Sequence, residues 1–106
     1  MKSEKTFENK VKLYLKQKGA YFIKTHGDRF SKVGVPDLIV CYKGLFIGIE
    51  LKAPNGKPSE LQLAHLKMIH KAGGMSMLLR PSTVDALWLE LDMIDEREVT
   101  TRTHEN

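Results

Sequence analysis

Residues 34 to 52, GVPDLIVCYKGLFIGIELK, decide the fold of this 106-residue chain. Two runs rich in β-branched and aromatic residues, Leu38 to Tyr42 and Leu45 to Leu51, predict two neighbouring β-strands. The dipeptide Lys43-Gly44 between them predicts a tight turn. We therefore expect an antiparallel hairpin at this point of the chain.

The length of the turn determines which side chains of the hairpin face each other. With a two-residue or four-residue loop, facing residues have numbers that sum to 87, and Asp37 lies opposite Glu50. Lys52 then shares their face, because side chains alternate along a strand, while Leu51 points into the opposite layer. A three-residue loop with a bulge at Gly44 would instead place the two carboxylates on different faces.

The composition is that of one globular domain, with 42% hydrophobic and 28% charged residues. We expect the domain to span residues 1–94 and residues 95–106 to form a polar, frayed tail. The net charge of +4 and the pI of 9.2 are compatible with a polyanionic partner such as DNA. The lone Cys41 excludes an internal disulfide and is expected in the core.

No signal peptide or membrane-spanning run is apparent in the sequence. We therefore expect a protein without membrane association that acts in the cytoplasm of a bacterial cell or of a phage-infected host.

Turn residues and apolar spacing divide the rest of the chain into helices and strands. The predicted elements are a helix over 4–18, a strand over 20–24, a helix from Ser59 to Gly73-Gly74, a strand over 75–79 and a helix over about 83–91 capped by Ser82. The apolar face of the helix after Ser59 is expected from Leu61, Leu63, Leu66, Met68 and Ile69. The order α-β-β-β-α-β-α predicts an α/β fold in which helices cover both faces of a mixed β-sheet.

The two facing carboxylates need a positively charged partner. Glu50 lies in the run LFIGIEL, which is too apolar for an ordinary exposed strand, and an isolated buried charge is very costly. Lys52 can neutralise one acid as a structural ion pair, but it cannot neutralise two. Mg²⁺, which proteins hold by one or two carboxylates, suits the pair, unless both acids lie at the solvated rim of the hairpin.

Several motifs carry a resemblance to a known family. Pro36-Asp37 followed by Glu50-Leu51-Lys52 is similar to the PD-(D/E)xK nuclease signature. Gly34-Val35-Pro36-Asp37, together with Ser59-Glu60-Leu61-Gln62 and a helix that ends in glycine, resembles the short stand-alone form of the VRR-NUC family. The resemblance extends over roughly residues 4 to 91.

The resemblance implies a restriction-endonuclease-like fold, dependence on Mg²⁺ or Mn²⁺ and hydrolysis of DNA phosphodiester bonds. Similarity to Holliday-junction resolvases implies selectivity for branched DNA. It makes Asp37, Glu50 and the Leu51 carbonyl metal ligands, with Glu8 as a further acid from the first helix. It also makes Lys52 the catalytic lysine.

Two implied site residues have structural explanations as well. Glu8 stands early in a helix, where a negative charge is favourable without any metal. Gln62 is a candidate catalytic residue, but the capping box after Ser59 explains a glutamine at that position by itself.

The segment before the hairpin forms a candidate DNA-binding loop. It carries the basic residues Lys24, His26, Arg29 and Lys32, which either contact DNA phosphates or are merely solvated.

Symmetric cutting of two strands by a chain of this size would require two active sites, which predicts a homodimer. We expect its apolar patch on the 75–79 strand and around Trp88, although the core is the favoured place for Trp88. The predicted function is thus a metal-dependent DNA endonuclease. The alternative is a noncatalytic nucleic-acid-binding module with the same fold.

Overall fold

The computed structural model describes residues 2–25 and 33–102. Its elements are α1 (Lys2–Lys18), β1 (Tyr21–Lys24), β2 (Leu38–Tyr42), β3 (Leu45–Leu51), α2 (Glu60–Lys71), β4 (Met75–Leu79), the short 3₁₀ turn η1 (Pro81–Thr83) and α3 (Asp85–Arg102). The predicted order of helices and strands is confirmed.

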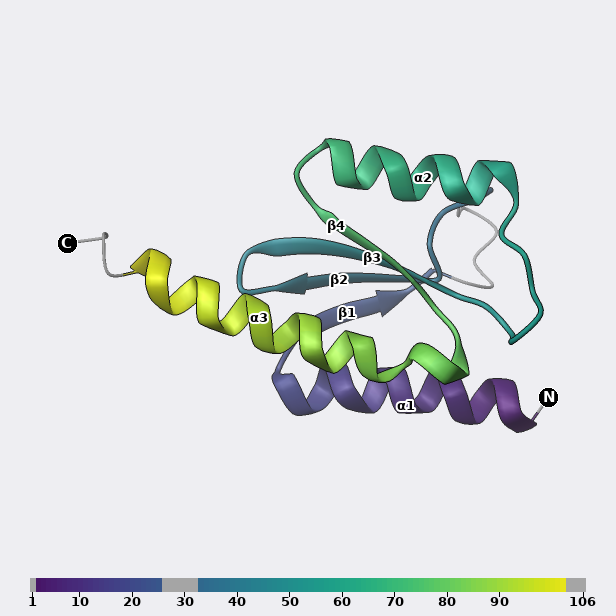
Figure 1. Cartoon of the computed structure of the whole chain (residues 1–106), viewed down its shortest axis with the longest axis horizontal. Coiled ribbons are helices and arrows are strands. Elements are labelled where there is room, and N and C mark those ends of the chain that lie inside the picture. Colours follow the sequence, from purple (N-terminus) through teal and green to yellow (C-terminus); the bar gives the residue numbers. More distant parts are fainter. Residues whose placement is uncertain (1, 26–32, 103–106) are drawn as a thin grey trace.

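The strands form one mixed sheet in the order β1-β2-β3-β4. The pairs β1–β2 and β2–β3 are antiparallel, and β3–β4 is parallel because the crossover helix α2 joins them. Helix α2 lies on one face of the sheet, and α1 and α3 lie on the other (Figure 1). This arrangement confirms the predicted α/β fold with a helix-flanked mixed sheet.

The hairpin has the register that brings the two acids to one face. Leu38 pairs with Ile49 and Tyr42 pairs with Leu45, so partner numbers sum to 87. Lys43 and Gly44 have φ angles of 53° and 82°. Two successive positive φ angles define the two-residue turn that best matches the twist of paired strands. The three-residue loop with a Gly44 bulge does not form.

The main core lies between the sheet and the helices α1 and α3. Its buried members on the sheet are Leu38, Val40, Tyr42, Ile47, Ile49 and Leu79, and on the helices Phe7, Val11, Leu15, Leu87, Leu91 and Ile94. Alternate residues of β2 and β3 belong to this set, as the period of two requires. Asp37 and Glu50 fall on the opposite face, which α2 covers in part.

Helix α2 begins with the predicted capping box. Ser59 Oγ accepts from the Gln62 backbone N–H, and Gln62 Oε1 accepts from the Ser59 N–H. The helix lies close to the sheet over Gly48, where an added Cβ would come within 2.5 Å of Ile69 Cδ1.

The predicted apolar face of α2 is only partly buried. Leu66 is buried, but Leu61, Leu63 and Met68 are 45–53% exposed. The helix contacts β3 and β4 and leaves the adjoining part of the sheet uncovered. For the same reason Cys41, expected in the core, is exposed.

The last helix differs from its prediction at both ends. Ser82 does not cap it, because Pro81–Thr83 form a 3₁₀ turn in which Thr83 Oγ1 accepts from the Arg80 N–H. The helix also continues past Leu91 to Arg102. Tyr42 and Lys18 both contact Asp95, at 2.5 and 2.9 Å, and Ile94 is buried, so tertiary contacts extend the helix.

Trp88 is half-buried and packs against α1, and its part in a dimer patch stays a prediction. Its ring meets Tyr14 edge-on at 5.4 Å, and Lys18 Nζ lies 4.7 Å from its centroid. Within the described ranges, no helix is long and apolar enough to span a membrane. The predicted domain boundary at residue 94 stays a prediction.

Candidate active site

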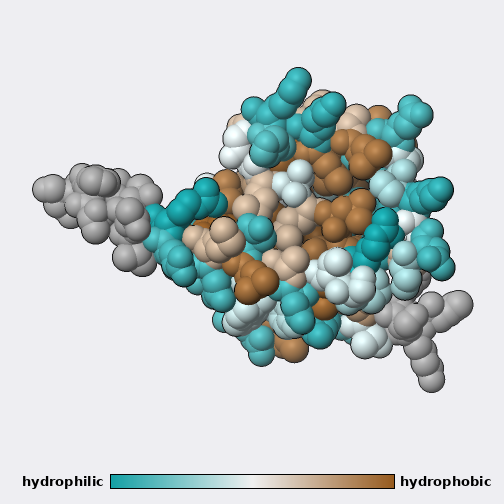
Figure 2. Space-filling view, viewed as in Figure 1, coloured by the Kyte–Doolittle hydropathy of each residue, from teal (hydrophilic) through white to brown (hydrophobic). Residues whose placement is uncertain are grey.

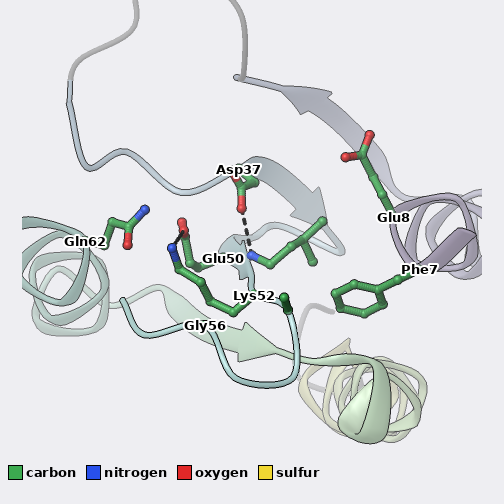
Figure 3. Close-up of a pocket in the computed structure, with 9 residues that line it drawn as sticks. Phe7, Glu8, Asp37, Glu50, Lys52, Gly56 and Gln62 are labelled. Atoms are coloured by element: carbon green, nitrogen blue, oxygen red, sulfur yellow. Dashed lines mark hydrogen bonds and ion pairs between the residues drawn. The ribbon is translucent and has the colours of Figure 1, made fainter. Parts of the chain in front are cut away.

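A cavity of about 460 Å³ opens where β2 begins and β3 ends. The predicted catalytic and metal-ligating residues, which come from four segments of the chain, lie around it (Figure 3). Its lining consists of Phe7, Glu8, Asp37, Glu50, Leu51, Lys52, Ala53, Gly56 and Gln62.

Asp37 is held at the start of β2 by backbone contacts on both sides. Its carbonyl accepts from the Thr25 N–H at 2.9 Å, which continues the pairing of β1 with β2. Its carboxylate Oδ2 accepts from the Leu51 N–H at 2.8 Å (Figure 3). The side chain is only 9% exposed. A carboxylate is thus fixed at the mouth of the hairpin, directed at the neighbouring strand.

Glu50 is the most buried ionisable group of the cavity, with 2% of its surface exposed. Its Oε2 lies 3.6 Å from Lys52 Nζ, and Lys52 is itself largely buried. Water screens the attraction between the two charges little in such a place, but burying them also costs solvation. Figure 3 places both side chains on the cavity side of β3, as the register predicted.

Leu51 contributes backbone groups to the cavity, while its side chain packs against the main core. Its N–H points toward Asp37, and the N–H and C=O of one strand residue point to the same side of the strand. The Leu51 carbonyl is therefore directed toward β2, and its role as a metal ligand stays a prediction.

Glu8 lines the cavity from α1, but its carboxylate is engaged elsewhere. Its Oε2 lies 2.9 Å from both Lys12 Nζ and Lys24 Nζ. Burial raises the pKa of Glu8, but the hydrogen bonds from these two lysines outweigh it and lower the pKa below its ordinary value. Across the described part of the chain, no three His, Cys, Asp or Glu side chains converge as a metal-binding group. The role of Glu8 as a ligand stays a prediction.

Gln62 serves the capping box and also borders the cavity. The cap uses its Oε1, and the amide nitrogen is directed toward Glu50 (Figure 3). The structural explanation of Gln62 is confirmed, and its position is compatible with the catalytic one.

The candidate DNA-binding loop is described only at its beginning. Lys24 is paired with Glu8 across the end of β1. The other three basic residues, His26, Arg29 and Lys32, lie outside the described residues.

Arg80 supports the cavity and was not predicted from the sequence. Its Nη1 donates to the carbonyls of Ala53 and Gly56, at 2.9 and 2.6 Å. Ala53 and Gly56 line the cavity directly after Lys52, so Arg80 fixes the loop that forms one wall. Only its place before Pro81, at the end of a predicted strand, could have drawn attention to it.

Fold and site together define an α/β domain with two acids and a lysine at the open end of a β-hairpin. A solved structure described as a VRR_NUC domain is similar to this chain with a TM-score of 0.64 and 25% sequence identity, over 79% of this chain and 91% of that chain. The chain has the VRR-NUC fold, which is that of a nuclease-like domain family, and the predicted resemblance is confirmed. No protein-family model and no curated protein matches the sequence.

Proposed function

We propose that this protein is a metal-dependent DNA endonuclease that hydrolyses phosphodiester bonds. The observation that carries the proposal is the buried Glu50, paired with Lys52 in the cavity that Asp37 also lines. A structural ion pair would need only one acid. The second acid, held beside it at the same open end of the hairpin, argues for a site that receives a cation.

The donor atoms available here suit Mg²⁺ or Mn²⁺. Both ions prefer oxygen ligands, and Mg²⁺ is usually held by one or two carboxylates plus water and substrate phosphate. Asp37, Glu50 and the Leu51 carbonyl would hold the ion, and Glu8 would join them after leaving its lysines. A bound ion of this kind polarises a phosphoryl oxygen and lowers the pKa of a coordinated water.

The remaining chemistry belongs to the protein's own side chains. Lys52 orients the attacking water or offsets negative charge on the phosphate, since a fixed cation in a site of low dielectric stabilises developing charge strongly. Gln62 donates its amide N–H groups into the cavity. The Leu51 N–H keeps Asp37 in place through turnover.

Branched DNA is the proposed substrate, and a homodimer the proposed assembly. The net charge of +4 favours a polyanion. A twofold dimer would present two equivalent cavities, and two cavities could cut two strands of a junction symmetrically.

Cleavage of a four-way junction, a flap and a plain duplex at matched salt would test this proposal, because phosphate-driven affinity changes steeply with salt. We expect products with Mg²⁺ or Mn²⁺ and none with EDTA. Lys52→Met should lower the rate by orders of magnitude, whereas Lys71→Met, on the exposed last turn of α2, should not. Metal-independent binding of all three DNAs without any cleavage would favour the noncatalytic binding module instead.

A further inference from the structure

Strand β4 lies at the end of the sheet, with β3 on one side. In Figure 1 it is the front strand, lying between α2 and α3. Figure 2 shows hydrophobic side chains gathered in the same region, between the two helices. Among the described strands none pairs with the outer side of β4.

The parallel ladder determines which backbone groups of β4 face outward. The Lys52 N–H donates to the Leu79 carbonyl, so Leu79 faces β3. Backbone groups alternate along a strand, so Met75 and Met77 also face β3. The N–H and C=O groups of Ser76 and Leu78 therefore point out of the sheet, which makes two donors and two acceptors.

This edge lacks the usual protection against strand pairing. The sequence Met75–Leu79, MSMLL, contains no charged residue, no proline and no bulge. The opposite edge strand, β1, is four residues long and ends in Lys24. A groove of about 270 Å³ follows β4, and its lining is apolar apart from Ser76, Thr83 and Glu90.

We propose that a second copy of this chain pairs with β4 in antiparallel orientation, about a twofold axis at Met77. In this register partner numbers sum to 154, so Ser76 of each copy faces Leu78 of the other. Each of these two pairs exchanges two hydrogen bonds, so all four outward groups are used. A register shifted by two residues in either direction would pair fewer of these outward N–H and C=O groups. The proposal supplies the interface of the homodimer proposed above and rests on it.

The charge of the edge favours a protein partner, but its size alone does not. Among the described residues, Glu90 is the one charged residue that lines the groove, and a carboxylate disfavours the approach of DNA phosphates. Five strand residues span about 17 Å, and the layers stacked about 10 Å above and below the sheet give the edge a depth of about 20 Å. This edge of about 340 Å² is smaller than the roughly 800 Å² per partner of a standard specific dimer, so the strand hydrogen bonds and the flanks of α2 and α3 would have to contribute.

The pairing would give one eight-stranded sheet with the two cavities on the same side. A twofold axis perpendicular to the sheet keeps each α2 on its own face. Glu50 lies on the α2 face in both copies, so both sites open toward the same side of the dimer. This is the arrangement that one DNA junction could contact.

The first experiment measures the molar mass of the wild type and of Ser76→Pro by light scattering. The protein concentration is varied over about 1–100 µM, the range in which a dimer of micromolar affinity dissociates. The lost N–H faces outward, so the ladder with β3 stays intact and proline is tolerated at such a position. We expect dimeric wild type and at least tenfold weaker association in Ser76→Pro. If that variant fails to fold, Leu78→Lys serves the same purpose. Ile23→Lys, on the uncovered part of the sheet, is the matched control and should stay dimeric.

The second experiment tests the register by crosslinking. In a Cys41→Ser background, Met77→Cys should form an intermolecular disulfide, because a non-hydrogen-bonded pair has Cα atoms about 4.5 Å apart. Monomeric wild type, or a dimer that Ile23→Lys abolishes and Ser76→Pro leaves intact, would overturn the proposal. Cleavage is measured separately, and single-strand nicking by a monomer would leave the proposed endonuclease standing.

Discussion

The Leu51 backbone N–H donates to Asp37 Oδ2 at 2.8 Å, so the end of one strand holds the acid at the start of its neighbour. This bond crosses the mouth of the hairpin, where the β2–β3 pairing ends at Leu38 and Ile49. It keeps Asp37 beside the cavity and directs backbone groups of Leu51 toward the same space. The side-chain oxygen of an asparagine can accept the same hydrogen bond from the Leu51 N–H. Replacing Asp37 by asparagine therefore removes the charge and keeps the position of the side chain.

Replacement of Asp37 by asparagine should stabilise the protein in the absence of metal. Two unit charges ~5 Å apart at an effective dielectric of ~20 repel by about 3 kcal/mol, and Lys52 offsets part of this. We expect a gain of about 1 kcal/mol, or roughly 4–8 °C in Tm for a domain near this size. Thermal melts in EDTA measure it.

Millimolar Mg²⁺ or Mn²⁺ should then raise the Tm of the wild type more than that of Asp37→Asn, because binding to the native state stabilises it. Asp37→Ala is the matched control. It loses the acceptor for the Leu51 N–H and should melt below Asp37→Asn in EDTA. A lower Tm of Asp37→Asn than of wild type in EDTA, with equal responses to metal, would show that the carboxylates do not form a cation site.

Glu8→Gln distinguishes a metal ligand from a residue that only stabilises α1. The ion pairs of Glu8 with Lys12 and Lys24 are partly exposed, and such pairs contribute under about 1 kcal/mol each. We expect a Tm change of a few degrees at most, and Mn²⁺ binding at least ~10-fold weaker by calorimetric titration, or about 1.4 kcal/mol. Unchanged Mn²⁺ affinity would assign Glu8 to helix stability alone.

Arg80→Gln should loosen the wall of the cavity without touching the acids. The guanidinium donates to the Ala53 and Gly56 carbonyls, and hydrogen bonds with a charged partner contribute about 1.5–3 kcal/mol. We expect a lower Tm and about tenfold slower cleavage, because small displacements of positioning groups are costly. Arg80→Lys should recover part of both losses. Cleavage at the wild-type rate by a destabilised Arg80→Gln would limit Arg80 to folding.

Asp95 should make stability sensitive to acid. Hydrogen bonds from Tyr42 and Lys18 hold its pKa below the ordinary value. A lowered pKa in the folded state contributes stability above the unfolded pKa of about 3.9, and this contribution disappears as the pH falls through the folded pKa. Asp95→Asn should therefore melt below wild type at pH 7, with a difference that shrinks below about pH 4. A difference that is constant from pH 7 to pH 2 would contradict this.

Tyr42 should make the stability of the protein sensitive to alkaline pH. Burial, followed by the hydrogen bond to Asp95, raises the pKa of Tyr42 to about 12. A raised pKa contributes stability below the unfolded value of about 10, and that contribution is lost as the pH rises toward the folded value. Melts of wild type and Tyr42→Phe between pH 8 and pH 12 should converge at the alkaline end.

The parts of the fold that follow from local chemistry could be predicted from the sequence. Lys43-Gly44 specifies a two-residue turn, the turn sets the register, and the register sets which residues share the face of Glu50. The capping box of Ser59 and Gln62 is equally local. For these features, three or four neighbouring residues contain all the information.

The features that were missed depend on contacts between distant segments. Helix α3 continues past its predicted end because Tyr42 and Lys18 hold Asp95. Cys41 is exposed because α2 covers only part of its face of the sheet. The engagement of Glu8 by Lys24 likewise joins residues whose contact only the assembled fold creates.

The central claim is that the cavity of Asp37, Glu50 and Lys52 hydrolyses DNA with a divalent cation. The most direct test compares the cleavage of a labelled four-way junction by wild type and Glu50→Gln, in Mg²⁺ and in EDTA, with folding confirmed by thermal melts. We predict cleavage by wild type in Mg²⁺ alone, and a loss of at least ~10³-fold, about 4 kcal/mol of transition-state stabilisation, in folded Glu50→Gln. Equal cleavage by wild type and folded Glu50→Gln, or cleavage that persists in EDTA, would contradict the account.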